Sequence, residues 1–191
     1  LISAKKSINS SNLYYYTWDV NDIDDIEFHL DKVKNLVGLY PNCLINNAGL
    51  LGGHKRIFET TPDDWDKLMR VNLTAPFLLT KYLLPNLKGA DNGRVILTSS
   101  GVAHKGRAFW GAYSTSKAAL DALVKSWANE QKNTSLKVNL YSPGPVRTAM
   151  RAQAMPGENP STLPTAEDVA PQIISLCAPD YQETGEIISK W

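Results

Sequence analysis

The sequence predicts an α/β protein with a doubly wound, mostly parallel sheet and helices on both faces. Two observations predict this class: short apolar segments of strand type alternate with amphipathic helical segments, and polar or glycine-containing turns follow the strands. The chain has 191 residues, which suits one hydrophobic core, and no internal repeat or low-complexity tract divides it. We therefore expect residues 1–191 to form a single domain.

The first third of the chain holds three predicted strands and one helix. The strand segments are Leu1–Ala4, Leu13–Trp18 and Cys43–Ile45. Between the last two, apolar residues recur at intervals of three and four from position 23 to position 37, which predicts a helix. Asn21 or Asp22 would cap this helix, and Gly38 and Pro41 would end it.

The middle of the chain predicts two longer helices around a strand. Thr61, Pro62 and the two acids after them form a helix start, and the helix should continue to about Leu87, with Pro76 and Pro85 bending or ending it. Residues 94–98 are apolar enough for a strand. A second helix is predicted from Tyr113 to about Gln131.

The last third predicts a strand at Leu136–Tyr141 and a long loop at Pro143–Pro164, which is interrupted by proline and glycine. Thr165 and Asp168 would then cap a helix that reaches Cys177. A short strand at Glu186–Ser189 closes the pattern.

Composition argues against several functional classes. Hydrophobic residues make up 43% and charged residues 20% of the chain, and 20 basic residues balance 19 acidic ones, so a nucleic-acid partner is not expected. The apolar runs are too short for a membrane helix, and the first residues lack a signal-peptide pattern. The apolar surroundings of Cys43 and Cys177 favour buried, reduced thiols over a disulfide, which predicts a cytoplasmic protein.

Tyr113 and Lys117 are the most informative pair. A spacing of four places both on one helix face, where an ammonium could favour the phenolate of a group whose pKa is ordinarily near 10. Ser100, at the end of a predicted strand, could donate to a substrate oxygen that Tyr113 protonates. Taken singly, each has an ordinary explanation: a chance pair on a helix, a serine in a turn and, for Asn72, an exposed polar residue beside a kink.

Five segments together resemble the short-chain dehydrogenase/reductase family in order and spacing. They are Asn46–Gly49, Asn72, Ser100, Tyr113-Ser-Thr-Ser-Lys117 and Pro143–Thr148. The resemblance runs from Asp19 to about Gly185, and residues 106–113 and 148–151 are most similar to a bacterial subgroup whose substrates are unassigned. It implies a Rossmann-like three-layer sandwich and an NAD(P)-dependent oxidoreductase that acts on a carbonyl or alcohol.

The resemblance also implies roles for individual residues. Tyr113 would be the general acid/base, Lys117 would lower its pKa and bind the nicotinamide ribose, Ser100 would orient the substrate, and Asn72 would hold a water in the proton relay. The implied cofactor-binding set is Asp19, Val20, Asn46, Asn47, Ala48, Gly49, Tyr113, Lys117, Pro143, Gly144, Val146 and Thr148. No metal site is expected, because His29, His54 and His104 lack ligand spacing.

The start of the chain departs from the family pattern. The family's opening strand, glycine-rich turn and helix have no counterpart here, and only residues 5–12 separate the first two predicted strands, whereas a parallel crossover needs a dozen or more residues. Either those strands form a hairpin or residues are missing from the chain as given. We favour the second interpretation, with a leading βα unit of roughly 30 residues absent.

The choice of cofactor and the alternative function depend on few residues. Lys5 and Lys6 follow the counterpart of the family's second strand, where an acid would select NAD, so NADP is slightly favoured over NAD. The family also implies a homodimer or homotetramer formed through helices near residues 75–87 and 113–131. The alternative is a non-enzymatic or cofactor-free scaffold that binds a partner; retention of Asn72, Ser100, Tyr113 and Lys117 favours the enzyme.

Overall fold

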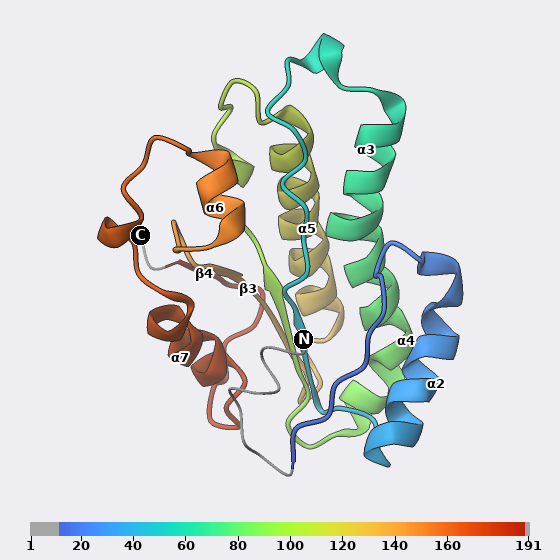
Figure 1. Cartoon of the computed structure of the whole chain (residues 1–191). Coiled ribbons are helices and arrows are strands. Elements are labelled where there is room, and N and C mark those ends of the chain that lie inside the picture. The colour runs from blue at the N-terminus through green and yellow to red at the C-terminus, as the bar shows by residue number, and fades with distance from the viewer. Residues whose placement is uncertain (1–11, 190–191) are drawn as a thin grey trace.

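A parallel four-stranded sheet forms the centre of the computed structural model, which describes residues 12–189. The strands lie in chain order across the sheet: β1 (Cys43–Asn46), β2 (Arg94–Thr98), β3 (Lys137–Ser142) and β4 (Ile187–Ser189). Helices cover both faces (Figure 1), so the predicted three-layer α/β architecture is confirmed. The predicted strand Leu1–Ala4 lies outside the described residues.

The helices are distributed unequally over the two faces of the sheet (Figure 1). One face carries α2 (Ile26–Val37), α4 (Ala75–Gly89) and α5 (Gly111–Glu130), with α3 (Pro62–Met69) packed on α5. The other carries α7 (Ala166–Leu176), and α6 (Ala149–Ala154) lies above the carboxyl ends of the strands. The shorter helical segments are η1 (Ile23–Asp25), η2 (Ile57–Glu59), η3 (Arg70–Thr74), η4 (Gly101–His104) and η5 (Pro160–Thr162).

Alternation along the central strands divides the core into two clusters. Val95 and Leu97 of β2 point into the cluster that includes Leu83 of α4 and Leu120 of α5, whereas Ile96 between them joins Leu176 of α7. Successive strand side chains face opposite sides of a sheet, so a strand covered by helices on both faces is apolar at every position. The continuous apolar run of β2 therefore follows from its central place.

Two of the three predicted helix caps are confirmed, whereas neither Asn21 nor Asp22 caps the first helix with its side chain. The Thr61 hydroxyl accepts a hydrogen bond from the Asp64 backbone N–H (3.1 Å), and Pro62 occupies the first turn of α3. Thr165 and Asp168 form a reciprocal capping box at the start of α7. Both caps satisfy backbone donors that the first turn of a helix leaves without a partner inside the helix.

Three predictions about local structure need correction. Residues 13–18 form no strand: Tyr16 and Trp18 instead pack on His29 of α2, with a 2.8 Å Tyr16–His29 hydrogen bond, so aromatic packing on a helix replaces strand pairing. The single helix expected from Thr61 to Leu87 is α3 and α4 joined by the π-helical turn η3. The long loop after β3 contains the short helices α6 and η5.

Arg94 organises the edge of the sheet where the strands begin. Its side chain is buried, with 1% exposure, and its guanidinium donates to five backbone carbonyls. These belong to Gly93, Ser135, Ala178, Pro179 and Tyr181, at 2.8–3.3 Å. The guanidinium thereby joins the start of β2 to the segment that follows α7.

The two cysteines meet at the same edge. Cys43 of β1 and Cys177 at the end of α7 are free, half-buried thiols whose side chains are hydrogen-bonded to each other. Burial, together with the neighbouring Cys177, raises the pKa of the Cys43 thiol to about 12. Cys43 is therefore protonated and a poor nucleophile at neutral pH.

Candidate active site

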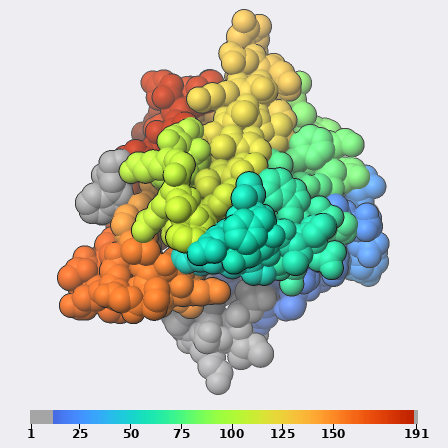
Figure 2. Space-filling model, turned by 90° about the horizontal axis from the view of Figure 1, so that it is seen from above, coloured from blue at the N-terminus to red at the C-terminus, as the bar shows by residue number. Residues whose placement is uncertain are grey.

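The opposite edge, where the strands end, gathers most of the predicted site residues. Asn46–Gly49 follow β1, Ser99 and Ser100 follow β2, and Pro143 and Gly144 follow β3. Figure 2 looks down on this edge: the segments after β1 (teal), β2 (yellow-green) and β3 (orange) meet on one face. Because β1, β2 and β3 are parallel, their carboxyl ends lie at one edge of the sheet, whereas no strand precedes Asp19.

Tyr113 lies in the first turn of α5, and its phenol is hydrogen-bonded to the side chain of Ser100. Burial raises the pKa of the Tyr113 phenol, and the bond to Ser100 opposes this only partly. That Lys117 lowers this pKa, as the family resemblance implies, stays a prediction. The Lys117 ammonium lies 5.8 Å from the centre of the Tyr113 ring.

Lys117 is a buried ammonium one turn further along α5. Its side chain is buried with 4% exposure, and Nζ donates to the carbonyl oxygen of Thr98 at 2.8 Å. Burial lowers the pKa of Lys117 to about 8, and the negative charge of Asp121 opposes that shift. The amine thus keeps its proton at neutral pH, although by a small margin.

Asn72 holds the loop that follows β1. It is fully buried in the π-helical turn η3, and its amide bonds both the N–H (2.7 Å) and the C=O (2.9 Å) of Leu50. The same amide donates to the Ser116 hydroxyl at 3.0 Å. These bonds fix the loop against α5, and the expected role of Asn72 in holding a water stays a prediction.

Gly49 marks the point where the backbone passes closest to these side chains. A Cβ at this position would lie 3.4 Å from Oδ1 of Asn72 and 3.7 Å from Nζ of Lys117. Glycine therefore keeps open the space directly in front of the Lys117 ammonium.

The two asparagines before Gly49 fasten the end of β1 on both sides. Asn46 Nδ2 donates to Thr80 of α4 at 3.4 Å, and Oδ1 of Asn47 accepts from the Thr98 hydroxyl at 2.9 Å. Asn47 and Lys117 thus both bond Thr98, at its hydroxyl and its carbonyl.

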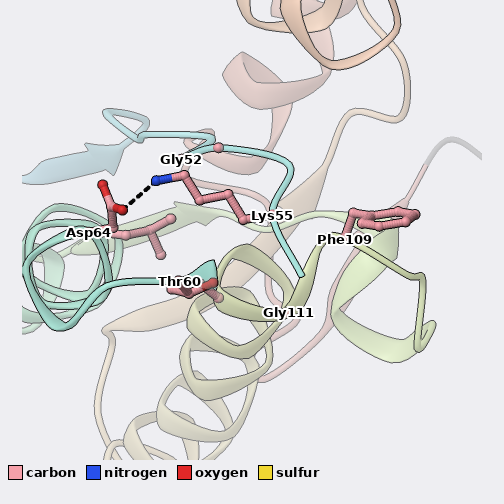
Figure 3. Close-up of a pocket in the computed structure, with 9 residues that line it drawn as sticks. Gly52, Lys55, Thr60, Asp64, Phe109 and Gly111 are labelled. Atoms are coloured by element: carbon pink, nitrogen blue, oxygen red, sulfur yellow. Dashed lines mark hydrogen bonds and ion pairs between the residues drawn. The ribbon is translucent and has the colours of Figure 1, made fainter. Parts of the chain in front are cut away.

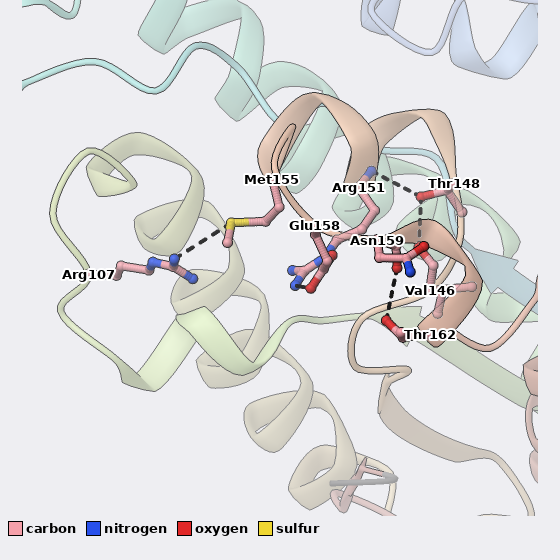
Figure 4. Close-up of polar contacts among 8 residues, drawn as sticks. All are labelled: Arg107, Val146, Thr148, Arg151, Met155, Glu158, Asn159 and Thr162. Atoms are coloured by element: carbon pink, nitrogen blue, oxygen red, sulfur yellow. Dashed lines mark hydrogen bonds and ion pairs between the residues drawn. The ribbon is translucent and has the colours of Figure 1, made fainter.

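Local polar contacts hold the segment after β3 in shape (Figure 4). Gly144 adopts φ +73°, a conformation that favours glycine, and the Thr148 hydroxyl accepts from the Arg151 N–H at 3.1 Å and so caps α6. Arg151 also forms a bidentate ion pair with Glu158, with both N···O distances 2.6 Å. The pair fixes the turn after α6 above the strand ends.

Asp19 and Val20 lie apart from this cluster, in the turn before η1. The Asp19 carboxylate is used locally, accepting from the Asn21 backbone N–H at 2.9 Å. Arg70 of η3 reaches the same turn through the Asn21 carbonyl at 3.4 Å. The structure therefore brings Asn72, Ser100, Tyr113 and Lys117 together, and among the described residues the turn of Asp19 is bonded to Arg70 of η3.

Apolar side chains pack against Tyr113, and a shallow hollow lies at the start of α5. Leu51, Trp110 and Ala154 form a buried cluster, with Val102, Met155 and Tyr113 packed against it. Residues that include Gly52, Lys55, Asp64 and Phe109 line a small, shallow hollow (Figure 3). Phe109 is 51% exposed with φ +69°, an unfavourable conformation for a bulky residue.

Sequence reasoning missed the polar groups behind the site. Asp121 lies one turn beyond Lys117, is bonded by Ser99 and is close to His104, while Ser116 bonds Asn72. Spacing alone could have found Asp121, because Tyr113, Lys117 and Asp121 are separated by four residues each. Within residues 12–189, no group of three His, Cys, Asp or Glu side chains is placed to bind a metal ion, and no helix has the length and apolar character needed to cross a membrane.

Known proteins resemble this chain in sequence and in structure. An uncharacterized oxidoreductase of Escherichia coli, YciK, is 43% identical over 149 residues, which are 76% of this chain and 59% of that protein. The chain thus spans less than two thirds of this relative's length. A short chain dehydrogenase from Salmonella enterica serovar Typhi superposes with a TM-score of 0.86 at 36% identity, covering 98% of this chain and 77% of that one.

A second solved structure is a complex. It is described as a short chain dehydrogenase of another Escherichia coli strain bound to NADPH, with a TM-score of 0.80, 36% identity, and coverage of 93% of this chain and 72% of that chain. The family model for short chain dehydrogenases matches residues 2–159. The chain belongs to the short-chain dehydrogenase family.

Proposed function

We propose that this protein is an NADP(H)-dependent oxidoreductase that interconverts a carbonyl and an alcohol, with Tyr113 as the acid/base. The observation that carries the proposal is the meeting of three groups at one strand end: a phenol bonded to Ser100 and, one turn along the same helix, the buried Lys117 ammonium. Similar structures bound to NADPH and NADP support this choice of cofactor over NAD. Lys5 and Lys6, which favoured NADP in the sequence, lie outside the described residues.

The residues around Gly49 fit a nicotinamide cofactor. The absent Cβ of Gly49 leaves space before a buried ammonium, and a lysine ammonium has three donors suited to ribose hydroxyls. Lys117 would bind the ribose. The residues that would border the cofactor are Asn46–Gly49, Pro143, Gly144, Val146 and Thr148. When bound, the cofactor supplies or accepts the hydride.

Tyr113 and its neighbours would transfer the proton. Because burial raises its pKa, the Tyr113 phenol carries a proton at neutral pH and can give it to a carbonyl oxygen that becomes an alkoxide. The Lys117 cation stabilises the phenolate that remains. Ser100 donates to the same substrate oxygen and so orients it, and in the oxidation direction the phenolate takes the proton back.

The test is turnover by the full-length protein with NADPH and a panel of aldehydes, ketones and alcohols, followed through nicotinamide absorbance. Tyr113→Phe is expected to lower kcat by about 10³-fold, because positioned acid/base groups contribute that order of rate. Tyr40→Phe is the matched control: its hydroxyl bonds Asp31 on α2, away from the strand ends. Equal rates for the wild type and Tyr113→Phe would contradict the assignment, and no turnover of any substrate would favour the scaffold alternative.

We further propose that the protein is a cytoplasmic homodimer or homotetramer that pairs through α4 and α5. Phe77 of α4 and Trp127 of α5 stack with ring centres 6.1 Å apart, and Phe77 is 37% exposed, which leaves an apolar surface on these helices. Light scattering on the full-length protein tests this, and Phe77→Glu is expected to produce monomers. A wild type that is already monomeric would contradict the proposal.

A further inference from the structure

Asp121 is a buried carboxylate behind the site. It is 2% exposed on α5, one turn beyond Lys117. The Ser99 hydroxyl donates to Oδ1 at 2.6 Å, and Nε2 of His104 lies 2.7 Å from Oδ2. A carboxylate removed from water is costly unless it is hydrogen-bonded and paired. Here Oδ1 accepts the Ser99 hydrogen bond, whereas Oδ2 is close to His104 but makes no hydrogen bond with it.

The partners of Asp121 come from the segments that carry the proposed catalytic groups. Ser99 immediately precedes Ser100 at the end of β2, and His104 belongs to η4, the short helix that Ser100 begins. Asp121 itself belongs to α5, the helix of Tyr113 and Lys117. One carboxylate thus joins the segment of Ser100 to the helix of Tyr113.

Asp121 also acts on Lys117 through charge. Burial disfavours the ammonium form and lowers the Lys117 pKa to about 8, while the Asp121 charge raises it. Loss of that negative charge would let Lys117 release its proton at lower pH. The cation that stabilises the Tyr113 phenolate would then be absent from more molecules at neutral pH.

The other charged groups packed on α5 are occupied elsewhere. Asp64 of α3 pairs with Lys55, Arg70 of η3 with Asp24, and Tyr141 of β3 bonds Gln172 at 2.7 Å. The remaining charged residues of α3 are exposed to solvent. The titratable groups around Lys117 are therefore Tyr113, Asp121 and, through Asp121, His104.

We propose that Asp121 is a positioning residue for the reaction proposed above. Through Ser99 and His104 it holds the end of β2 and η4 against α5, and through its charge it keeps Lys117 in the ammonium form. The charge part of the inference concerns this chain alone, whereas its effect on rate rests on the proposed function.

Two variants separate charge from position. Asp121→Asn keeps an oxygen that accepts from Ser99 but removes the charge, whereas Ser99→Ala removes the hydrogen bond and keeps the charge. Lys117 is titrated by nuclear magnetic resonance of the side-chain amines in ¹⁵N-lysine protein, with its signal assigned through Lys117→Arg. We expect Asp121→Asn to lower the Lys117 pKa by about one unit or more, and Ser99→Ala to leave it unchanged.

The second readout is the pH profile of kcat/KM with a substrate found in the panel. The alkaline limb that follows Lys117 deprotonation is expected to move to lower pH in Asp121→Asn and to stay in place in Ser99→Ala. The proposal would be overturned if Lys117 titrated in Asp121→Asn as it does in the wild type. It would also be overturned if both variants lost kcat/KM equally and the alkaline limb of the pH profile moved in neither. If the wild type turns over no substrate, the proposed function fails, while the amine titration still decides the charge part.

A third variant covers the case in which Asp121→Asn does not fold. The His104 side chain is 58% exposed, so His104→Gln should fold. Without the His104 ring beside it, the Asp121 carboxylate is less neutralised and acts more strongly on the Lys117 ammonium. We therefore expect the Lys117 pKa to rise. An unchanged Lys117 titration in His104→Gln would contradict coupling through Asp121.

Discussion

Two buried cations lie at opposite edges of the same sheet and are stabilised in different ways. Arg94, where the strands begin, is 1% exposed, and five backbone carbonyls accept from its guanidinium. Lys117, where the strands end, is 4% exposed and donates to the Thr98 carbonyl, and burial lowers its pKa to about 8.

The difference indicates that one edge of the sheet serves stability and the other serves the proposed reaction. A guanidinium keeps its charge throughout the physiological range and offers five donors in a fixed plane, so it can satisfy many carbonyls permanently. An ammonium gives up its proton when buried, which makes it sensitive to neighbours such as Asp121. We infer that Arg94 serves stability, whereas Lys117 serves the proposed reaction at the expense of stability.

The first way to test this contrast is to remove the guanidinium. Arg94→Met keeps much of the side-chain volume but leaves buried carbonyl oxygens without donors, so we expect a loss of about 3–5 kcal/mol in the free energy of unfolding. Urea denaturation of both proteins measures it. A loss below about 1 kcal/mol would mean that water or neighbouring donors replace the guanidinium, and the contrast would fail.

The matching change at the other edge is Lys117→Met. We expect kcat to fall by about 10²-fold or more, which corresponds to roughly 3 kcal/mol in the barrier, together with weaker NADPH binding. Stability at pH 7 should stay the same or rise, because a buried charge is replaced by an apolar group. Calorimetry with NADPH and urea denaturation test the last two points; clear destabilisation would place Lys117 in the same structural class as Arg94.

The smallest expected effect is a difference in pH dependence. The ordinary Lys117 pKa of 10.5 falls to about 8 in the folded protein, so between these values the unfolded chain binds more protons. Stability due to Lys117 therefore rises with pH through this window and is lost as pH falls towards 8. From pH 8 to 9.5 we expect the wild type to gain roughly 1–2 kcal/mol relative to Lys117→Met; parallel curves for the two proteins would rule this out.

Local chemistry made much of the fold predictable. The starts of α3 and α7 were predictable because their capping residues act within a single turn. These residues are Thr61 with Pro62 and Thr165 with Asp168, and both helices begin where expected. The apolar run of β2 and the four-residue spacing of Tyr113 and Lys117 can likewise be read from neighbouring residues in the sequence. The edge location of Ser100 followed from the general rule for parallel sheets.

What escaped prediction depends on partners distant in sequence. The aromatic residues at 13–18 have strand propensity, yet Trp18 stacks on His29 with ring centres 4.6 Å apart. The burial that raises the Tyr113 pKa depends on the packing of distant residues, so the spacing of Tyr113 and Lys117 alone did not reveal it. The hydrogen bond between Asp121 and Ser99 joins residues that lie 22 positions apart and meet only in the folded chain, so the sequence analysis overlooked Asp121.

The contacts of Arg94 also have a kinetic side. Its bonds to Ala178, Pro179 and Tyr181 span 84–87 residues, so a long segment must be ordered before the guanidinium finds its acceptors. Because closing such long segments is entropically costly, we expect these contacts to form after the local helices. We therefore expect the contacts of Arg94 to have almost no effect on the folding rate and to slow the unfolding of the native protein. Slow unfolding in turn protects the protein from proteases.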